Sequence, residues 1–338
     1  MTIRNDYPLK AHNTFGLSAC CRQFIEYTSD DEAIEAARML RDADQPFLII
    51  GEGSNLLLTK DFPGIVVRSA IKGRTIKAQA DGTSLLECGS GEQWEETVRW
   101  TVSQGYSAFV NLSLIPGDVG ASAVQNIGAY GVEVAQYIDH IRAVDIATGQ
   151  MVVIDAAECH YAYRDSRFKH EWKNRFLICQ VCYRLPQDET LRIGYGNISE
   201  ELARRQITSP TAEQLRQVII DIRRQKLPDP SVLGNAGSFF MNPIISREHF
   251  ERLVSNYPDM PHYEVDTERV KIPAAWLIDQ CGWKGRSMGR AGVHQRQPLV
   301  LVNLGGATGD EVVALCRAIQ DDVKRKFGIE LHPEVNIV

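Results

Sequence analysis

Two glycine-rich stretches contain the residues whose types and spacing are best suited to holding a ligand. The first consists of Gly51, Glu52, Gly53, Ser54 and Asn55. Glycine lets backbone amides approach a ligand closely, and successive amides form a nest for an anion such as a diphosphate. The stretch matches neither the GxGxxG dinucleotide fingerprint nor the phosphate-binding GK[ST] loop, and an ordinary tight turn explains it equally well.

The second glycine-rich stretch lies within residues 107–131, which show neither a helical nor a strand period. Its candidate cofactor-binding residues are Pro116, Gly117, Gly120, Ser122, Asn126, Gly128, Ala129, Tyr130 and Gly131. Long structured loops inside compact domains are usually functional. Two such loops, separated by strands and a helix, suggest a diphosphate-containing cofactor that is gripped at two points and lies flat against one loop.

Strands and helices must position these loops. The apolar run Phe47–Ile50 predicts a buried strand that ends at the first loop. Ser29 and Glu32 have the spacing of a capping box at the start of a helix over 31–40. The other elements expected in this half are strands at 65–68, 85–88, 141–146 and 151–154 and a helix at 94–104.

The second half of the chain begins with a polar segment, residues 186–210, which we interpret as a linker. Thr211 and Gln214 have capping-box spacing before an amphipathic helix. The remaining expected elements are a helix from Pro273 to Cys281, a helix from Thr308 to Phe327 and a final strand over Ile329–Val338. The mixture of helices and strands predicts α+β domains.

The composition is that of an ordinary globular protein. The chain has 338 residues, 44% of them hydrophobic and 24% charged, with a formal net charge of −6. The negative charge argues against general nucleic-acid binding, although a local basic patch can still hold an anionic ligand. No apolar run is long enough to span a membrane, and residues 1–10 lack the apolar core of a signal peptide, so we expect a cytoplasmic protein.

The eight cysteines suggest no metal or redox site. Cys179 and Cys182 form a CxxC, but the surrounding residues 176–185 are typical of a strand, where side chains three positions apart point to opposite faces. A zinc site of the usual kind would need a second pair of ligands, and no second CxxC exists. We therefore expect eight free thiols, as is usual in a reducing compartment.

Nine short motifs spread along the chain occur in the order found in one known family. They are NTFG at 13–16, GEGSN at 51–55, IPG at 115–117, QNIGAYG at 125–131, YRDS at 163–166, KLPDP at 226–230, GNAGSFFMNP at 234–243, AAWLIDQ at 274–280 and PEV at 333–335. On these residues the chain resembles the UDP-N-acetylenolpyruvoylglucosamine reductases, also called UDP-N-acetylmuramate dehydrogenases. One short motif would carry little weight, whereas nine in family order are highly specific.

The resemblance implies an α+β fold with an FAD-binding domain of the vanillyl-alcohol-oxidase type and a smaller α+β substrate-binding domain. The implied boundaries are 1–187 for the FAD-binding domain (with two subdomains that meet near 70), 188–210 for a connecting segment, 211–328 for the substrate-binding domain and 329–338 for a C-terminal strand. The first loop contains no histidine or cysteine, so we expect FAD to be held non-covalently. Relatives often have proline at the position of Ala123, and we expect the loop to tolerate this change.

The family chemistry implies NADPH-dependent, FAD-mediated reduction of UDP-N-acetylglucosamine enolpyruvate to UDP-N-acetylmuramate, a step of peptidoglycan precursor synthesis. Three positions match the family's catalytic residues: Ser238 as proton donor, Arg164 as the arginine that binds the substrate carboxylate, and Glu334 as the acid that assists at the enol-like intermediate. A guanidinium suits a carboxylate because its planar fork donates two parallel hydrogen bonds. A serine hydroxyl becomes a useful acid only when its surroundings polarise it.

Further positions match substrate-binding residues of the family. They are Tyr163, Tyr195, Lys226, Asn242, Lys284 and Gln297. Tyr195 lies between two glycines, as suits a mobile loop, and places the chain in the longer subgroup, whose tyrosine loop folds over the substrate. The resemblance also suggests a monomer.

Two other functions remain open at this stage. A flavin oxidase of the same fold would consume oxygen and would need a base, whereas Ser238 suits a proton donor. A non-catalytic protein that binds FAD or a UDP-sugar would be favoured by loss of Ser238, Arg164 or Glu334, and all three are present. An assay of oxygen consumption and a test of UDP-sugar turnover separate the three possibilities.

Overall fold

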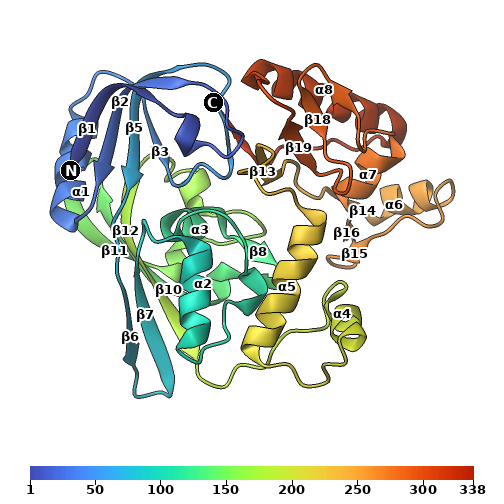
Figure 1. Ribbon diagram of the computed structural model, residues 1–338, viewed down its shortest axis with the longest axis horizontal. Coiled ribbons are helices and arrows are strands. Elements are labelled where there is room, and N and C mark those ends of the chain that lie inside the picture. Colours follow the sequence, from blue (N-terminus) through green and yellow to red (C-terminus); the bar gives the residue numbers. More distant parts are fainter. The chain divides into compact units, whose positions relative to one another are not determined.

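The computed structural model describes all residues, 1–338, which form two compact units (Figure 1). Unit 1 comprises Met1–Tyr7, Cys21–Glu52 and Phe62–Arg223, and unit 2 comprises Pro8–Cys20, Gly53–Asp61 and Arg224–Val338. Each unit thus collects several stretches, whereas the boundaries drawn from the sequence were contiguous. The assignment of those segments to FAD and substrate stays a prediction, because compactness alone assigns no ligand.

Unit 1 is organised around two sheets. Their strands are β1 (Thr2–Pro8), β2 (Cys20–Tyr27), β3 (Phe47–Ile50), β5 (Phe62–Ser69), β6 (Arg74–Ala78), β7 (Thr83–Gly89), β10 (Ile138–Asp145), β11 (Gln150–Asp155) and β12 (Phe176–Pro186). One sheet has the order β1-β2-β5-β3, with β5 parallel to β2 and β3. The other has the order β11-β10-β12-β7-β6, and its neighbouring strands are antiparallel.

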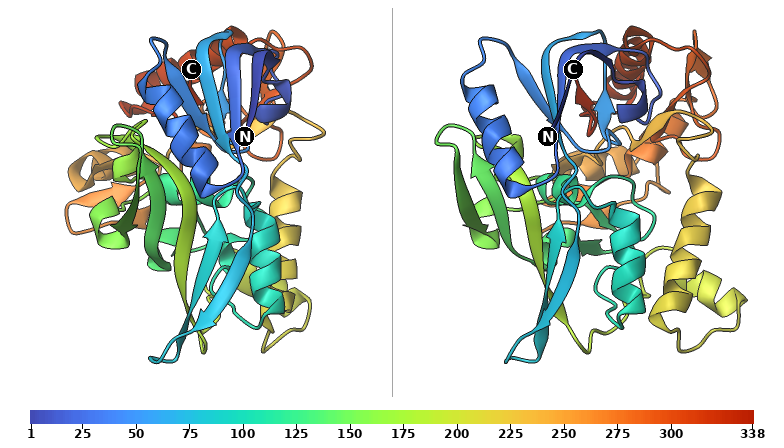
Figure 2. Two further views of the ribbon diagram at one scale, coloured as in Figure 1. Left: turned by 90° about the vertical axis from the view of Figure 1, so that its left-hand side faces the viewer. Right: turned by 60° about the vertical axis from the view of Figure 1, so that its left-hand side comes forward.

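Helices cover both faces of the five-stranded sheet (Figure 2). The helices between Asp30 and Lys226 are α1 (Asp30–Arg41), α2 (Trp94–Ser103), α3 (Val119–Gln125), α4 (Ile198–Arg204) and α5 (Ala212–Lys226), with the 3-10 turns η2 (Val110–Leu112), η3 (Val134–Gln136), η4 (Ala156–Cys159) and η5 (Arg167–Lys169). The alanine-rich face of α1 packs between the two sheets, whereas α2 and α3 pack on the opposite face of β7, β10 and β12. Helix α5 packs with α4 and η2 through its predicted apolar face.

Unit 2 contains a second antiparallel sheet of order β13-β19-β18-β17 and a small sheet of order β14-β16-β15. Its strands are β4 (Leu56–Leu57), β13 (Asn235–Ser238), β14 (Ile244–Ser246), β15 (Tyr263–Glu264), β16 (Arg269–Lys271), β17 (Ser287–Met288), β18 (Ala291–Val293), β19 (Val300–Asn303) and β20 (Asn336–Ile337). Its helices are η1 (Lys10–His12), α6 (Arg247–Val254), α7 (Ala274–Gln280) and α8 (Gly309–Phe327). The apolar faces of α7 and α8 form one core with β18 and β19.

The helix ends follow the capping signals in the sequence. The Ser29 side chain accepts a hydrogen bond from the Glu32 amide at the start of α1. Thr211 and Gln214 form the reciprocal bonds of a capping box at α5, and Thr308 and Glu311 do so at α8. These contacts satisfy amides that have no partner inside the first helical turn.

Three expectations were wrong or incomplete. The long loop of 107–131 contains the helix α3 and the strand β8 (Gly128–Ala129), which pairs with β9 (Val132–Glu133) just after the loop, because its small residues pack tightly against the sheet. The polar linker contains α4, whose Ile198 and Leu202 are buried. The final strand over Ile329–Val338 shrinks to β20, which pairs with β4 in parallel, because only its end has a strand partner.

None of the helices combines the length and apolar character that crossing a membrane would require. All eight cysteines are free, and burial raises the pKa of both Cys179 and Cys182 to about 12. Both thiols lie on β12, as the sequence predicted for this segment.

Candidate functional site

The two glycine-rich stretches are tied together within unit 1. The Gly117 amide donates to the Glu52 carboxylate at 2.7 Å. A Cβ at Gly51 would lie 3.1 Å from the Cβ of Ala121, and one at Gly120 would lie 3.0 Å from the Cβ of Ser90. The glycines are therefore needed for close packing of the loops on each other and on the sheet, in addition to any role in binding a ligand.

A buried carboxyl group lies between these loops. Asp118 is only 2% exposed, and neither of its carboxylate oxygens has a hydrogen-bond partner. Burial raises its pKa to about 6, although Arg68, 3.5 Å away, favours the ionised form. A Cβ at Gly51 would be 3.3 Å from the carboxylate, so the group lies directly against the first loop.

The remainder of the first loop belongs to unit 2. Gly53 has φ +79°, and a Cβ there would collide with the carbonyl of His12. The Asn55 side chain donates to the Glu334 carbonyl at 3.1 Å, and the Asn55 carbonyl accepts from the Asn336 amide, also at 3.1 Å. Asn55 therefore anchors the C-terminal segment that carries Glu334, while Ser54 lies between these two fixed positions.

The second loop is organised by Asn126, which is fully buried and ends α3 with φ +44°. Its side-chain amide donates to Glu133 at 2.9 Å and to the Ala162 carbonyl at 2.8 Å. Its side-chain oxygen accepts from the Ala135 amide at 3.1 Å. One side chain thus holds the β8–β9 ladder, with Gly128 and Ala129, to the turn that contains Arg164.

Two other residues of the second loop face different surroundings. Ser122 is buried, and its hydroxyl donates to the Val119 carbonyl at 2.7 Å and lies 3.2 Å from the Tyr183 hydroxyl. Its side chain is therefore engaged inside the unit, which leaves its backbone for any contact with a cofactor. Pro116, in contrast, is exposed just before Gly117.

Arg164 lies at φ +55° in a tight turn, a backbone conformation that favours glycine. The turn is closed by two hydrogen bonds between the main chains of Ala162 and Asp165. A left-handed conformation costs a residue with a side chain about 1–2 kcal/mol, and such strain is concentrated at functional sites. The Arg164 guanidinium donates to the Gly128 carbonyl and lies 5.3 Å from the centre of the Tyr163 ring.

A second guanidinium, that of Arg223, lies near Arg164 and Tyr130, and it was not among the site residues predicted from the sequence. The Nε of Arg223 is shut away from solvent and has no hydrogen-bond partner. Burial lowers its pKa, the neighbouring Tyr130 opposes this change, and the charge of Arg164 adds to it. Burial also raises the pKa of Tyr130, against the effect of Arg223. The positive charges of Arg164 and Arg223 beside Tyr130 therefore form a site suited to binding an anion.

Arg223 was missed because its sequence signal is ambiguous. It belongs to the basic run at the end of α5, which is also what a solvated helix C-terminus looks like. Only the packing of α5 against the second loop distinguishes Arg223 from Arg224, which is exposed.

Tyr195 lies beside the second loop although it is 44% exposed. A Cβ at Gly131 would be 3.3 Å from the Tyr195 ring. The segment is held by the Asn111 side chain, which donates to the carbonyls of Tyr130 and Arg192 at 3.0 and 2.9 Å. Unit 1 thus brings together Tyr130, Arg164 and Tyr195 around one loop.

Ser238 in unit 2 is the last residue of β13 and is exposed, whereas the next two residues, Phe239 and Phe240, are buried. Gly237 before it has φ +67°, and its amide donates to the Asn235 side chain at 2.9 Å. The two buried rings fix the end of the strand, and the serine hydroxyl is left at the surface of the unit.

Glu334 lies next to this strand end. Its amide donates to the Phe239 carbonyl at 2.8 Å, and Phe240 and Pro333 form an isolated bridge. Glu334 was expected on a strand, and the structure gives instead a bend between Pro333 and β20. The bonds to Phe239 and Asn55 still hold its backbone beside Ser238, so unit 2 brings these two residues together.

The remaining candidates in unit 2 are more dispersed. The Asn242 side-chain oxygen accepts from the Ala274 amide at 2.9 Å at the start of α7. Lys284 is exposed, 3.5 Å from Asp279, and Gln297 lies in the turn before β19, where it accepts weakly from Leu299 at 3.4 Å. Lys226 is exposed at the end of α5.

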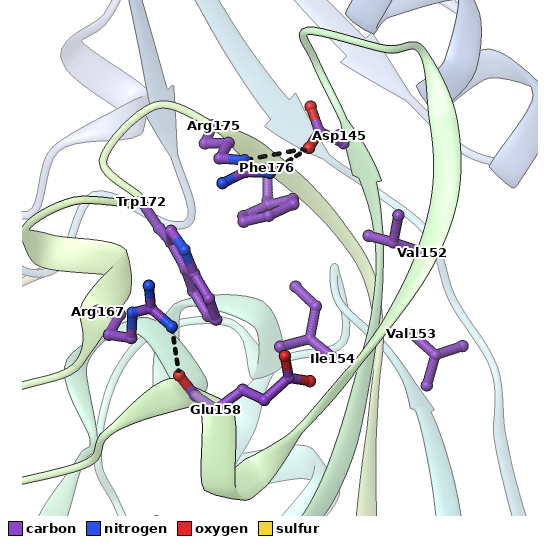
Figure 3. Close-up of a pocket in the computed structure, with 9 residues that line it drawn as sticks. All are labelled: Asp145, Val152, Val153, Ile154, Glu158, Arg167, Trp172, Arg175 and Phe176. Atoms are coloured by element: carbon purple, nitrogen blue, oxygen red, sulfur yellow. Dashed lines mark hydrogen bonds and ion pairs between the residues drawn. The ribbon is translucent and has the colours of Figure 1, made fainter.

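Unit 1 contains a pocket, which Figure 3 shows. Its volume is about 320 Å³, and it is lined by Asp145, Val152, Val153, Ile154, Glu158, Arg167, Trp172, Arg175 and Phe176. Arg175 is paired with Asp145 at 2.9 Å, and Arg167 donates to the Glu158 carbonyl and stacks on Trp172. Both cations are thus already engaged, and none of the candidate site residues lines the pocket.

Comparison with known proteins supplies the family. Residues 22–155 match the sequence model of an FAD-binding domain, and residues 229–338 match that of the UDP-N-acetylenolpyruvoylglucosamine reductase C-terminal domain. A reductase of that name from Bacteroides fragilis is 49% identical and covers 99% of this chain and 100% of its own. One from Paraburkholderia xenovorans is 48% identical, with coverage of 97% and 95%.

A solved structure shares the fold. The UDP-N-acetylenolpyruvylglucosamine reductase of Thermus caldophilus aligns with a TM-score of 0.67 over 99% of this chain and 98% of its own. Its sequence identity is 22%, so this likeness concerns the fold alone.

Proposed function

The chain belongs to the UDP-N-acetylenolpyruvoylglucosamine reductase family, and on that premise we propose that it catalyses the NADPH-dependent reduction of UDP-N-acetylglucosamine enolpyruvate to UDP-N-acetylmuramate. The reaction supplies a precursor of peptidoglycan. The observation that carries the proposal is identity of 49% over nearly the whole of both chains, combined with retention of Ser238, Arg164 and Glu334.

FAD is the cofactor of this reaction, and the match of residues 22–155 to an FAD-binding domain supports its binding here. When bound, FAD supplies the transfer of hydride from NADPH to the enolpyruvyl group. We propose that both glycine-rich stretches hold it non-covalently. The close approach of Gly51 and Gly120 to their neighbours, and the tie from Gly117 to Glu52, fit a backbone cradle that side chains would fill.

Arg164 is the proposed partner of the substrate carboxylate. As hydride adds to the enolpyruvyl double bond, negative charge moves toward this carboxylate, and a guanidinium fixed beforehand stabilises it without reorganising. The neighbouring Arg223 adds a second positive charge, with an Nε that has no partner inside the protein. Tyr130 lies against Arg223 and restricts where the anion can bind.

Ser238 is the proposed donor of the proton to the neighbouring carbon, and Glu334 assists at the enol-like intermediate. The exposed hydroxyl at the end of β13 and the backbone bond between Glu334 and Phe239 support a shared role for these two residues. A serine has a high intrinsic pKa, so the acid strength of Ser238 must come from charges around the bound substrate.

Substrate contacts are proposed for Tyr163, Tyr195, Lys226, Asn242, Lys284 and Gln297. The packing of Tyr195 against Gly131 supports a lid that opens and closes beside the second loop, as expected for the longer tyrosine-loop subgroup. Asn242 keeps its amide group for a ligand, because only its oxygen is used at α7. Lys226 and Lys284 are exposed cations suited to phosphates.

We also propose that the protein acts as a monomer in the cytoplasm. The family resemblance suggests a monomer, and eight free thiols fit a reducing compartment. Light scattering of the purified protein gives the mass directly, and a dimer would contradict the first statement.

The proposed function is tested by following NADPH oxidation with and without UDP-N-acetylglucosamine enolpyruvate. We expect a flavin absorption spectrum, oxidation that depends on the UDP-sugar, and UDP-N-acetylmuramate as product. NADPH oxidation that instead consumes oxygen and ignores the UDP-sugar would contradict the proposal and favour an oxidase. Binding of the UDP-sugar without turnover would identify a non-catalytic protein.

Ser238→Ala separates the two half-reactions. Reduction of the flavin by NADPH should continue at the wild-type rate, because no proton is needed from Ser238 in that step. Reoxidation by the UDP-sugar should fall by about 10²–10⁴-fold, the usual contribution of a general acid. Stopped-flow absorbance measures both steps, and Ser287→Ala, at another exposed serine, is the control. Equal reoxidation rates for both variants would remove Ser238 from the mechanism.

A further inference from the structure

The backbone of the Arg164 turn is held by a neighbouring lysine. The Lys169 ammonium donates to the Arg164 carbonyl at 2.7 Å. Lys169 is the last residue of the 3-10 turn η5. The Lys169 amide donates a hydrogen bond to the Ser166 carbonyl, which fixes the main chain of Lys169. The ammonium therefore reaches back over a rigid turn to the carbonyl of a residue with φ +55°.

Other contacts hold the turn at its ends, and Lys169 contacts the carbonyl of its residue Arg164. The Asn126 side chain donates to the Ala162 carbonyl at 2.8 Å, before the strained residue. The buried Ser166 hydroxyl donates to the Val124 carbonyl at 2.6 Å, after it. The two main-chain bonds between Ala162 and Asp165 close the turn, and the bond from Lys169 to the Arg164 carbonyl adds to them in opposing rotation of this peptide to an ordinary backbone conformation.

The orientation of the Arg164 side chain depends on this backbone. Its guanidinium donates to the Gly128 carbonyl, and a Cβ at Gly128 would be 2.6 Å from the Arg164 Nη1. The guanidinium thus fits closely against the second loop. If the backbone relaxed to negative φ, the Cα–Cβ bond would swing away, and the guanidinium would leave this position.

We propose that Lys169 is a positioning residue: its ammonium locks the strained backbone of Arg164 and so holds the guanidinium where the substrate carboxylate is to bind. This inference rests on the role proposed above for Arg164. Lys169 itself touches neither substrate nor cofactor in this scheme, and it acts only through Arg164. The arrangement explains how a turn that would suit glycine can carry a functional arginine without losing its geometry.

The test compares three variants of the flavin-loaded protein. Lys169→Met removes the donor and keeps the length of the chain, and it should lower kcat/KM for the UDP-sugar about tenfold. Flavin reduction by NADPH should change less than twofold. Lys169→Gln supplies a neutral donor and Lys169→Arg a charged one, so both should recover at least part of the loss. The matched control is Lys173→Met, at an exposed lysine of the same loop.

The decisive measurement places Lys169→Met in the Arg164→Met background. If Lys169 acts through Arg164, the second substitution should have no further effect on the rate with the UDP-sugar. A further tenfold loss in the double variant would overturn the inference, because Lys169 would then act independently. Recovery by Lys169→Arg but not by Lys169→Gln would also overturn it, in favour of a role of charge alone.

The same experiment distinguishes failure of this inference from failure of the proposed function. If Arg164→Met leaves turnover of the UDP-sugar unchanged, the role proposed for Arg164 is wrong. If Arg164→Met abolishes turnover while Lys169→Met matches the Lys173→Met control, only the positioning role is wrong. Melting temperature and flavin content of each variant identify any general loss of folding.

Discussion

Single residues in unit 1 combine burial with charge, and Asp118 is the clearest case. Its carboxyl group is buried without a hydrogen bond, close to Arg68, Lys72 and Glu52. Burial opposes ionisation more strongly than Arg68 favours it, so the group binds its proton more tightly in the folded than in the unfolded chain. The native state therefore loses stability as this carboxyl ionises.

Asp118→Asn should stabilise the protein above pH 6. The pKa of about 6 in the folded state exceeds the usual 3.8, so the stability contributed by the bound proton is complete below pH 4 and is lost as pH rises to 6. The gain from the neutral amide should reach about 3 kcal/mol at pH 7.5 and about half of that at pH 5. Urea unfolding at both pH values, with saturating FAD, measures it.

Asp44→Asn is the control for that experiment, because Asp44 is exposed and has no ion pair. It should alter stability little at either pH. If Asp118→Asn destabilises the protein at pH 7.5, the attraction between Asp118 and Arg68 outweighs the cost of burying the carboxylate, and the direction of the argument is reversed.

The elements of the chain show which local signals determine structure by themselves. At α8 the Thr308 side chain accepts from the Glu311 amide at 3.2 Å, and the Glu311 carboxylate accepts from the Thr308 amide at 2.8 Å. Gly328 at φ +66° ends the helix. All these residues lie within a turn of the helix end they control, so their pattern was sufficient to predict the helix.

Thr308→Ala should destabilise unit 2 by about 1 kcal/mol, because the Glu311 amide in the first turn loses the hydroxyl that accepts its hydrogen bond. The melting temperature should fall by about 2–4 °C. Thr308→Ser keeps the hydroxyl, so its melting temperature should stay close to that of the unmodified protein. Differential scanning calorimetry provides the measurement. Thr211→Ala makes the same change at α5 in unit 1, and a similar shift there would show that the effect belongs to the capping box.

Elements that depend on distant partners were predicted less well. Glu334 was expected on a ten-residue strand from the alternation of side chains, and that alternation is indeed present, with Leu331 and Val335 buried. A strand also needs a partner, however, and β4 pairs with only Asn336 and Ile337. Helix α3 was missed for the opposite reason: seven residues provide too few turns for a clear period, and its tight packing on the sheet decides its conformation.

At the scale of the whole molecule, the main surprise is the exchange of segments between units. Pro8–Cys20 and Gly53–Asp61 belong with the C-terminal unit, where the Thr14 carbonyl accepts from the Asn235 amide at 3.0 Å. No local sequence pattern predicts a contact between residues that are more than 200 positions apart. The motifs nevertheless predicted the family and the reaction, because each motif is a short run of residues that can be recognised without knowing which distant segments it contacts.

For the candidate site, too, local motifs were readable in the sequence, whereas contacts between distant segments were not. Ser238, Arg164 and Glu334 were proposed from motifs, and their roles stay a prediction. The bonds that hold the Arg164 turn, such as those of Asn126 and Lys169, join segments far apart or depend on a local backbone conformation. Arg223 was missed because a basic residue at a helix end has an ordinary explanation, and only its buried Nε indicates more. Residue types thus suggest which side chains act, and the fold was needed to find the contacts that position them.

Removal of FAD should lower the stability of the whole protein more than any single substitution above. A ligand that binds only the folded state stabilises it by RT ln(1 + [L]/Kd), which is about 2.7 kcal/mol at 100 times Kd. Flavin-free protein should therefore melt at a lower temperature, and the temperature should rise again with added FAD in proportion to the logarithm of its concentration. Added riboflavin, which lacks the diphosphate, should restore little if the glycine-rich loops bind that group. Equal rescue by riboflavin and FAD would show that the loops do not hold the diphosphate, and the glycines would then serve only the close packing of the chain.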